Sequence, residues 1–319
     1  MTNCSAFSLS VFSVAAAILG LATSGSAQTP VQHRVLAQDR GHVVILGTDG
    51  KIEWETPCGG TCHDIAMLPN GNILFPTDDR NIVEMTPAHQ IVWKHTSTPK
   101  VGYNGDVQIH AFQRLANGNT MVSESGNGRI IEVDKEDKIV FTMPLTLDHP
   151  NPHRDTRLVR ELKNGHILAC HEGDGVVREY DRTGKVVWTY KMDLDGHPET
   201  GGHDGHGINV FDALRLPNGN TLLGCGNGNR VIEVNPKGEV VWKLGYNDLP
   251  GIQFFWVTTI EVLPNGNIVI GNTHAGQINP QLIEVTREKQ VVWTLKNWDA
   301  LGNDTAAAQI LDIKGKVIR

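Results

Sequence analysis

A five-residue phrase recurs five times along the chain and limits its fold more than any other feature. The phrase is Leu-x-Asn-Gly followed by Asn or His. Its asparagines are Asn70, Asn117, Asn164, Asn218 and Asn265, spaced 47, 47, 54 and 47 residues apart. A period in the forties with strand-like content is typical of a β-propeller or a similar array. Asn-Gly between apolar runs also indicates a hairpin, because both residues tolerate positive φ.

A second pattern repeats at the same period. Five glutamates each precede an aromatic residue by nine positions: Glu84 and Trp93, Glu132 and Phe141, Glu179 and Trp188, Glu233 and Trp242, Glu284 and Trp293. Ile45 and Trp54 keep this spacing, with isoleucine in place of glutamate. Each pair spans a turn between two strand-like runs. The sequence therefore predicts six outer hairpins but only five inner ones.

The missing inner strand has a candidate late in the chain. Residues 307–316 resemble residues 111–119, which contain the second Asn-Gly turn. We expect 307–316 to supply the first strand of the blade whose other strands begin near Arg34. The sequence thus predicts an all-β fold: a six-bladed β-propeller of four-stranded antiparallel blades, closed by the C-terminal strand pairing with the N-terminal blade. Residues 28–319 would form a single β-propeller domain.

The first 27 residues differ in composition from the rest. They contain no Asp, Glu, Lys or Arg, and the apolar run 11–22 is followed by small residues up to Ala27. That run is too short to span a bilayer comfortably, and no later segment could span one. The pattern predicts a signal peptide over residues 1–27, so we expect a secreted protein in the periplasm or outside the cell.

The charge balance bears on the choice of partner. The chain has 28 Lys and Arg residues against 35 Asp and Glu residues, a formal net charge of −7. A mildly acidic protein is a poor candidate for binding nucleic acid. A small molecule, a carbohydrate or another protein remains as the partner.

The cysteines favour structure over cofactor chemistry. Cys58 and Cys62 lie in Cys-Gly-Gly-Thr-Cys-His, and in an oxidising compartment we expect a local disulfide there. Haem attachment normally requires Cys-x-x-Cys-His, and this segment has one residue too many, so haem is not expected. Cys170 and Cys225 end equivalent strands in neighbouring repeats, where we expect small buried apolar side chains.

The histidines point to one face of the predicted ring. Strands alternate in direction, so the Asn-Gly turns lie on one face, and the longer and more variable loops lie on the other. Most of the 14 histidines fall on or beside the long-loop face. The position seven residues before each repeated Asn begins an inner strand at the channel mouth. It holds His63, His110, Arg157, Phe211 and Thr258.

Further polar residues are expected at the same mouth. Histidines near the starts of inner strands or after second strands are His153, His171, His203, His206 and His274, and the acidic companions include Asp64, Asp106 and Glu172. Trp256 also precedes an inner strand there, where it would stack on a sugar or an aryl ring, or else pack between blades. Such convergence in a concave site is the default active-site hypothesis.

Three chemistries fit this set of side chains. His203 and His206, in His-Asp-Gly-His, could hold a divalent metal together with a carboxylate. A single histidine could act as a general base. A histidine could instead be a nucleophile that carries a transferred group, with an arginine stabilising the developing charge. No spacing in the sequence selects one of the three.

Two repeat segments carry a family resemblance. Asp-Arg-Thr-Gly-Lys-Val-Val-Trp at 181–188 and Asn-Pro-Lys-Gly-Glu-Val-Val-Trp at 235–242 resemble the repeat of pyrroloquinoline-quinone (PQQ)-like propellers. His63 and Asp64, ahead of the first Asn-Gly turn, resemble the blade signature of bacterial arylsulfotransferases, which are secreted six-bladed propellers. Repeat residues specify blades, so the resemblance bears on the fold more than on the function.

The two resemblances imply different activities. The quinone resemblance implies an oxidoreductase, but its quinone and calcium ligands have no counterparts that can be matched here, so PQQ is not expected. The sulfotransferase resemblance implies a transiently sulfated histidine, with other His and Arg residues holding the sulfate. Candidates of the right type are His110, His171, His203, His206, His274 and Arg157, with His63, Asp64, Asp106, His153 and Trp256 on the substrate side. The large N-terminal β-domain of that family is missing.

The sequence therefore supports two functional hypotheses. The first is group transfer or cleavage of a small molecule or carbohydrate at the His-rich mouth, by a histidine nucleophile or with the help of a metal. The second is a non-catalytic propeller scaffold that binds a ligand or a protein. An enzyme would lose turnover on His110→Ala without losing its fold, whereas a scaffold would tolerate that change.

Overall fold

The computed structural model describes residues 1–2, 32–59, 63–195 and 210–319. Contacts divide the chain into Met1–Pro30 and Val31–Arg319. Residues 3–27 of the predicted signal peptide lie outside the described residues, and so do Cys62, His203 and His206. The described residues contain no α-helix, and therefore no helix long and apolar enough to cross a membrane.

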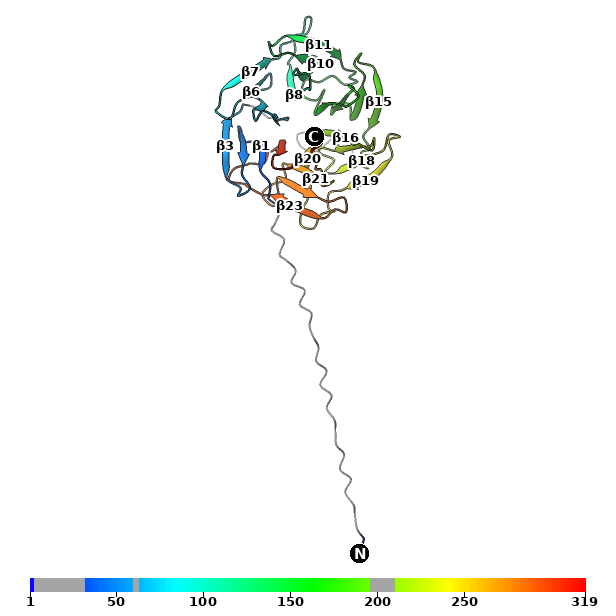
Figure 1. The fold of residues 1–319 in the computed structure, drawn as a ribbon. Helices are drawn as coiled ribbons and strands as arrows, with labels where there is room; N and C mark the ends of the chain where they lie inside the picture. The colour runs from blue at the N-terminus through cyan, green and yellow to red at the C-terminus, as the bar shows by residue number, and fades with distance from the viewer. Residues whose placement is uncertain (3–31, 60–62, 196–209) are drawn as a thin grey trace. The chain divides into compact units, whose positions relative to one another are not determined.

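The described strands form six four-stranded antiparallel sheets arranged in a ring (Figure 1). The six-bladed propeller predicted from the sequence is confirmed. The first blade contains β24 (Ala307–Ile310), β1 (Val35–Asp39), β2 (His42–Leu46) and β3 (Ile52–Pro57). The second contains β4 (Ala66–Met67), β5 (Ile73–Pro76), β6 (Asn81–Met85) and β7 (Ile91–Thr96). The third contains β8 (Gln108–Arg114), β9 (Thr120–Ser125), β10 (Arg129–Val133) and β11 (Ile139–Pro144).

The remaining three blades follow in chain order. The fourth contains β12 (Val159–Glu161), β13 (Ile167–His171), β14 (Val176–Tyr180) and β15 (Val186–Lys191). The fifth contains β16 (Asp212–Arg215), β17 (Thr221–Gly224), β18 (Val231–Val234) and β19 (Val240–Leu244). The sixth contains β20 (Trp256–Val262), β21 (Ile268–Thr273), β22 (Leu282–Val285) and β23 (Val291–Leu295).

The ring closes within the first blade. Strand β24 pairs antiparallel with β1, from Val35 opposite Ile310 to Gln38 opposite Ala307. This is the pairing that the similarity of 307–316 to 111–119 predicts. Because β24 and β1 are far apart in the chain, the first blade has no Asn-Gly hairpin between its two inner strands.

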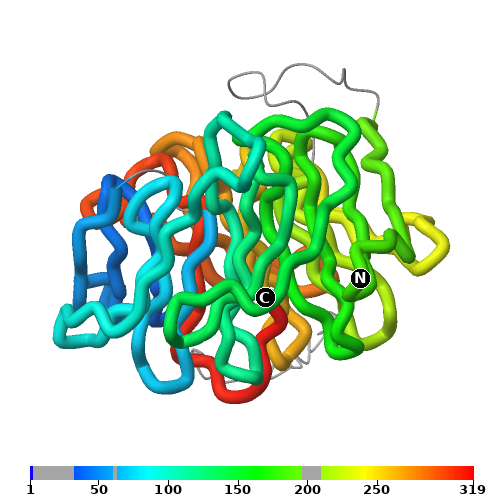
Figure 2. Tube along the Cα trace, turned by 90° about the horizontal axis from the view of Figure 1, so that it is seen from above, coloured from blue at the N-terminus to red at the C-terminus, as the bar shows by residue number. Residues whose placement is uncertain are grey.

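The ring has two unlike faces. Figure 2, turned by 90° from Figure 1, shows the strands running from one face to the other. The five Asn-Gly turns join the two inner strands of the second to sixth blades on one face, which we call the turn face. The glycines of these turns have φ between 80° and 89°, the left-handed region that favours glycine. The opposite face, where the inner strands begin, is called the mouth face.

The nine-residue spacing of Glu and aromatic residue has a direct structural cause. In each of the five repeats the two side chains are partners across the two outer strands, as for Glu84 with Trp93 and Glu179 with Trp188. The register shifts directly after the glutamate in all five. Each glutamate accepts a hydrogen bond from the last residue of its own Asn-Gly phrase; these residues are Asn72, Asn119, His166, Asn220 and Asn267.

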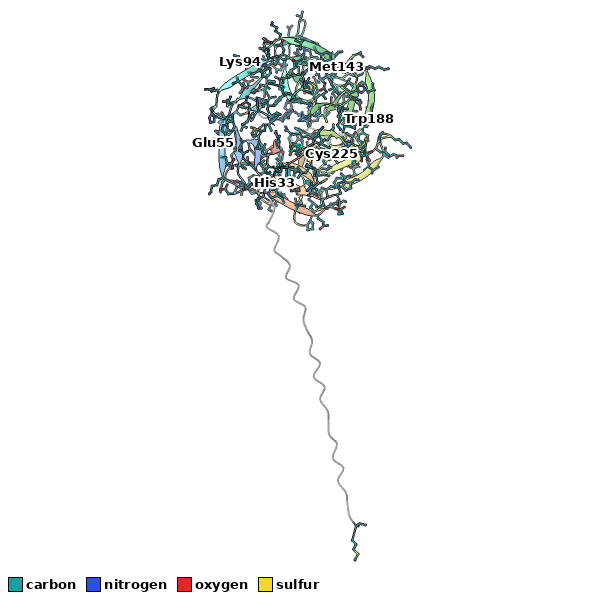
Figure 3. The ribbon with its side chains drawn as sticks, in the orientation of Figure 1. His33, Glu55, Lys94, Met143, Trp188 and Cys225 are labelled. Carbon is teal, nitrogen blue, oxygen red and sulfur yellow. The ribbon has the colours of Figure 1, made fainter. Side chains whose placement is uncertain are left out.

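Each glutamate also binds a cationic or ionisable side chain from the next blade. Arg114 binds Glu84, Arg182 binds Glu132, Arg215 binds Glu179, Arg287 binds Glu233, and His33 binds Glu284. The same side chains lie against the aromatic partners: the four guanidiniums are 3.8–5.4 Å from the ring centroids of Trp93, Phe141, Trp188 and Trp242, and the His33 ring is 4.8 Å from that of Trp293. Figure 3 labels His33, and Trp188 at the rim of the ring. We call this three-residue unit the interblade clamp.

The first blade lacks the clamp. Ile45 takes the place of the glutamate opposite Trp54. The second blade correspondingly offers Met67 where Arg114 and Arg215 stand in later blades. The imidazole of His89 takes the place of the guanidinium against the aromatic ring: it stacks on Trp54 with ring centroids 5.1 Å apart. This boundary is therefore held by apolar and aromatic packing.

The cores lie between neighbouring blades, which bury their facing apolar side chains in six clusters. Cys170 and Cys225 are free, buried thiols in one of these clusters, as the sequence predicts. Burial raises the pKa of the Cys225 thiol to about 12. Cys58 is also a buried thiol, and its S–H donates to the carbonyl of Pro76 at 2.9 Å. Because Cys58 is a free thiol here, the local disulfide that the sequence led us to expect at Cys58 is not formed.

Candidate functional site

Equivalent positions on four inner strands meet at the mouth face. His63, His110, Arg157 and Phe211 each stand seven residues before their repeated Asn. The His63 and His110 rings are 4.8 Å apart, and His63 lies 5.4 Å from Phe211. The guanidinium carbon of Arg157 lies 5.3 Å from the Phe211 ring. The register that the sequence suggests therefore brings these four side chains into one cluster.

Arg157 is the centre of this cluster. It is fully buried, and its Nε donates to Glu172 Oε2 at 2.5 Å. Burial lowers the pKa of Arg157, and the charge of Glu172 opposes that shift. Its Nη1 lies 3.2 Å from His63 Nδ1. Because a guanidinium can only donate, His63 accepts at Nδ1 and carries its ring proton on Nε2.

His110 has different hydrogen-bond partners. Its Nδ1 lies 2.8 Å from the backbone carbonyl of Thr156, which can only accept a hydrogen bond. The Nδ1 of His110 therefore carries a proton. The Nε2 of His110 lies 3.0 Å from Gln108 Oε1 and has a free lone pair only when the Gln108 amide turns its NH2 group to that side. The Thr156 hydroxyl is held by Ser123 at 2.7 Å and by Ser125 at 2.9 Å. The two imidazoles thus lie side by side and are held by different groups.

His153 extends the cluster toward solvent. Its ring lies 5.5 Å from that of His110, and Gln108 Oε1 lies within 3.0 Å of one nitrogen of each ring. His153 is exposed, whereas His63 and His110 are only 9% and 5% exposed. A ligand arriving from solvent would meet His153 first. Arg157, which is fully buried, lies behind the imidazoles.

Asp64 and Asp106 belong to different surroundings. Asp64 is buried, and its two oxygens accept from Arg160 at 2.7 and 2.9 Å and from the Phe112 amide at 3.0 Å. This pairing makes it a structural contact between inner strands. Asp106 is exposed and pairs with Arg80 at 3.3 Å. Both carboxylates thus pair with arginines.

His171 lies inside the fourth blade. Its Nδ1 lies 2.7 Å from the Asp155 carbonyl, its Nε2 lies 2.8 Å from the Tyr180 hydroxyl, and the side chain is fully buried. Burial lowers the pKa of His171 to about 4. With both nitrogens engaged, this ring is neutral near pH 7 and holds the segment that leads to Thr156.

Trp256 and His274 form a second aromatic group at the mouth face. Their rings stack with centroids 5.0 Å apart, and Trp256 lies 5.9 Å from Phe211. Trp256 is 7% exposed, so it packs between blades and presents little surface for stacking on a sugar. His274 Nδ1 lies 3.0 Å from Asp304 Oδ1. Phe211 thus connects this group to the imidazole pair.

The donor set bears on the metal hypothesis. The described residues contain no group of three His, Cys, Asp or Glu side chains that could hold a metal ion. A guanidinium beside His63 and His110 also disfavours a second cation there. The predicted metal ligands His203 and His206 lie outside the described residues.

Sequence reasoning missed three parts of this site. Gln108 joins two imidazoles, and the Thr156 carbonyl holds the Nδ1 proton of His110. Ser123 holds Thr156 from the second strand of the third blade. Gln108 and Thr156 lie within two residues of His110 and Arg157, and this closeness in the sequence is the only feature that could have pointed to them.

Known structures share the fold. A protein of unknown function from Bacteroides caccae aligns with a TM-score of 0.72 and 23% identity, over 87% of this chain and 98% of its own. A catalytically inactive histidine-to-alanine variant of virginiamycin B lyase from Staphylococcus aureus, with quinupristin, aligns with a TM-score of 0.55 and 14% identity, over 86% and 87%. BBS1N in complex with ARL6DN aligns with a TM-score of 0.51 and 14% identity, over 88% and 78%.

The family comes from a comparison of sequences. No curated protein matches the chain. A family model described as outer membrane protein assembly factor BamB matches residues 79–252, which is more than half of the 319 residues. The match covers the strands of the third, fourth and fifth blades in full, together with the two outer strands of the second. The chain therefore belongs to this BamB family of PQQ-like propeller repeat proteins.

Proposed function

We propose that this protein is an enzyme that uses His110 at the mouth face for group transfer or cleavage on a small molecule. One observation carries the proposal: His63 and His110 lie 4.8 Å apart, with Arg157 against Nδ1 of His63 and the Thr156 carbonyl against Nδ1 of His110. A base or a nucleophile requires a lone pair on an oriented ring, and His110 Nε2 supplies one when the Gln108 amide presents its NH2 group there.

Transfer of a sulfuryl group from an aryl sulfate is the reaction that this arrangement suits best. The lone pair of His110 Nε2 attacks sulfur, the bond from sulfur to the aryl oxygen breaks, and the aryl oxide leaves as an anion. The Nε2–H of His63 donates to a sulfuryl oxygen. An acceptor phenol then attacks sulfur, the sulfur–nitrogen bond breaks, and the phenol proton passes to solvent.

The surrounding residues support these roles. The Thr156 carbonyl accepts from Nδ1 of His110 and so stabilises the positive charge that the ring gains when Nε2 is sulfated. Arg157 is fully buried and is therefore a positioning residue that fixes His63. His153, exposed and sharing Gln108 with His110, is placed to meet the substrate or the acceptor.

The test is turnover of 4-nitrophenyl sulfate with a phenol acceptor, followed by release of nitrophenolate. We expect His110→Ala to lower turnover by about 10²–10⁴-fold. The matched control is His166→Ala, a turn-face histidine that binds Glu179 and should leave turnover unchanged. Mass spectrometry of trapped wild-type protein should find 80 mass units, about one sulfuryl group, on His110. Equal turnover in His110→Ala would reject the proposal.

The assay also separates the alternatives. Because virginiamycin B lyase shares the fold, quinupristin serves as a second substrate; its cleavage without aryl sulfate turnover would identify a lyase. Loss of activity after chelation, with recovery on adding Zn²⁺, would favour metal-assisted chemistry through His203 and His206. No turnover of any substrate, together with binding of one, would identify a scaffold.

Secretion is part of the proposal. The uncharged segment 1–27 supports it. Expression of the full chain in a bacterium should release a product whose first residue is Gln28, as shown by N-terminal sequencing. A full-length product in the cytoplasm would contradict it.

A further inference from the structure

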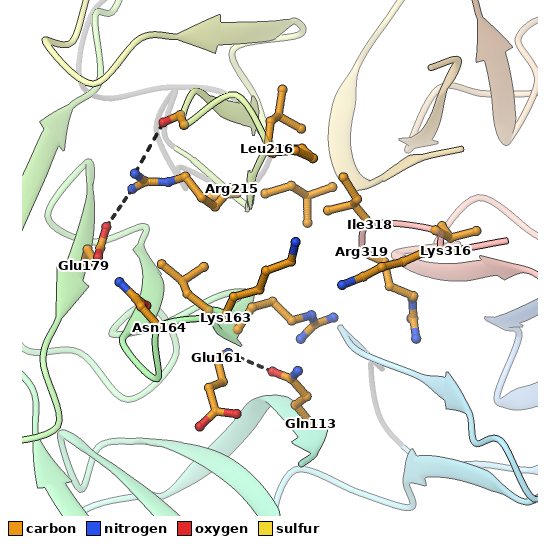
Figure 4. Close-up of a pocket in the computed structure, with 17 residues that line it drawn as sticks. Gln113, Glu161, Lys163, Asn164, Glu179, Arg215, Leu216, Lys316, Ile318 and Arg319 are labelled. Atoms are coloured by element: carbon orange, nitrogen blue, oxygen red, sulfur yellow. Dashed lines mark hydrogen bonds and ion pairs between the residues drawn. The ribbon is translucent and has the colours of Figure 1, made fainter. Parts of the chain in front are cut away.

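A cavity of about 730 Å³ opens on the turn face, away from the imidazoles (Figure 4). It lies between the inner strands of the fourth and fifth blades and the segment 316–319. Its charged lining residues are Arg160, Glu161, Lys163, Glu179, Arg215, Lys316 and Arg319. Small-molecule sites typically occupy about 300–1,000 Å³, so the volume suits a compact organic ligand.

The cavity exists because the first blade has no Asn-Gly hairpin. After β24 the chain runs on across the turn face instead of turning into a second strand. Ile318 pairs with Val262 through two backbone hydrogen bonds of 2.9 and 3.0 Å. Arg319 then enters the ring, where its Nε lies 3.1 Å from Glu261 Oε1. The segment 316–319 thus forms one wall, and the fourth and fifth blades form the other.

The cavity has a surplus of positive charge. Arg160 binds Asp64, Arg215 binds Glu179, and Glu161 lies 3.6 Å from Arg182. Lys163 and Lys316 form no hydrogen bond or ion pair with any residue that the structure describes. Both are exposed, and Figure 4 shows Lys163 extending into the middle of the cavity. Two ammonium groups are therefore left to face a ligand.

The rest of the lining is mainly apolar. Leu162, Leu214 and Leu216 come from the two blades, and Val317 and Ile318 come from the opposite wall. An anion with no apolar part would leave these apolar side chains exposed to water. A neutral apolar molecule would leave the two ammonium groups without a binding partner. The combination selects for a molecule that has both parts.

This cavity is separate from the mouth. Between them lies a cavity of about 10 Å³, lined by His63, Asp64 and Arg160 among others. That volume holds about one water molecule. Arg160 and Arg319 line both cavities and form the layer between them. A ligand on the turn face therefore does not reach the imidazoles.

We propose that this turn-face cavity binds a small amphipathic organic anion, with an apolar body and one terminal carboxylate, sulfate or sulfonate. Lys163 and Lys316 bind the anionic group, and Leu214, Leu216 and Ile318 contact the body. The site is independent of the activity proposed for the mouth.

Two dyes with the same apolar body test this site on the full chain. 1-Anilinonaphthalene-8-sulfonate carries a sulfonate, and N-phenyl-1-naphthylamine carries none. We expect saturable fluorescence with the sulfonate dye, and about tenfold weaker binding of it to Lys163→Gln/Lys316→Gln, from two partly exposed ion pairs. Binding of the neutral dye should change less than twofold. Octanoate and octyl sulfate should each displace the sulfonate dye.

The controls fix the location. Lys314→Gln removes an exposed lysine two residues from Lys316 that does not line the cavity, so it should bind the sulfonate dye as wild type does. His110→Ala should also bind it unchanged, and a thermal melt checks that each variant is folded. The proposal is overturned by equal binding of the sulfonate dye to wild type and the double variant, by an equal loss for both dyes, or by the absence of saturable binding.

Discussion

The turn face and the mouth face are built from the same repeat, but side chains recur from blade to blade on the turn face and differ from blade to blade on the mouth face. On the turn face, five blades repeat one clamp: a glutamate, an aromatic ring and a side chain from the next blade. On the mouth face, one register position holds His63, His110, Arg157, Phe211 and Thr258 in successive blades. Where side chains repeat, they hold blades together. Where the same strand position holds a different side chain in each blade, the ring brings chemically different groups together at one place.

Arg157→Met should cause the largest loss, because it removes the guanidinium from the buried Glu172 and from His63 Nδ1. We expect a fall of about 3–5 kcal/mol in the free energy of unfolding, measured with urea, and loss of turnover. Arg287→Met is the matched change on the turn face. Its guanidinium is 35% exposed, so its loss should be about 1 kcal/mol. Equal losses would remove the distinction between the faces.

Ile45→Glu attempts to install the absent clamp and should destabilise the protein by about 3 kcal/mol. Ile45 is 4% exposed, so the new carboxylate would be buried. Adding Met67→Arg places a guanidinium where Arg114 and Arg215 stand in other blades. The double variant should recover at least half of the loss in urea unfolding. No recovery would mean that the clamp depends on more than these positions.

Glu84→Ala and Glu233→Ala should each lower stability by about 2 kcal/mol, because each leaves an arginine and one or two asparagines without an acceptor. If the clamp is a true repeat, the two losses agree within about 0.5 kcal/mol, and aryl sulfate turnover is unchanged. A difference above about 1 kcal/mol would show that the blades are not equivalent.

The His33 clamp should depend on pH where the arginine clamps do not. Burial lowers the pKa of His33, but the hydrogen bond and charges of Glu284 and Asp312 outweigh it, so the pKa is raised above 6.5. Its contribution is complete below pH 6.5 and is lost as pH rises through the raised pKa. Burial would raise the pKa of Glu284, but His33 and Asn267 lower it, so that contribution is lost only in acid.

The measurement is a melting curve of His33→Gln against wild type from pH 5 to 9. The stability difference should be about 1 kcal/mol near pH 6 and disappear by pH 9. Arg287→Gln should show a constant difference over that range. A difference for His33→Gln that stays constant would mean that His33 contributes by packing alone.

The fold was largely predictable because its signals are local. An Asn-Gly turn specifies a hairpin whatever surrounds it, and the spacing from Glu179 to Trp188 records a cross-strand pair. The closing strand could be found because 307–316 resembles an internal segment. The side chain that each clamp takes from the next blade could not be predicted, because its position varies: Arg114 comes from an inner strand and Arg182 from an outer turn.

The site was predictable only in part. Counting back from the repeated Asn placed His63, His110 and Arg157 at one level, and the ring brought them together. His171 follows a second strand, and its sequence context resembled that of His274. Only the structure shows that its two nitrogens bind Asp155 and Tyr180 inside a blade. Residues that enter from crossings of unequal length, such as His153, have no register to count from.

The clamp has a direction. Each of five blades presents an acceptor to its successor, and each successor presents the complementary donor, so these blades join head to tail like identical links. A blade of this kind can be duplicated or removed without changing the type of contact between its neighbours. An extra blade inserted between the third and fourth would meet complementary partners at both of its borders. The seam at Ile45 and Met67 has no such partners, and it alone breaks the interchangeability of the links.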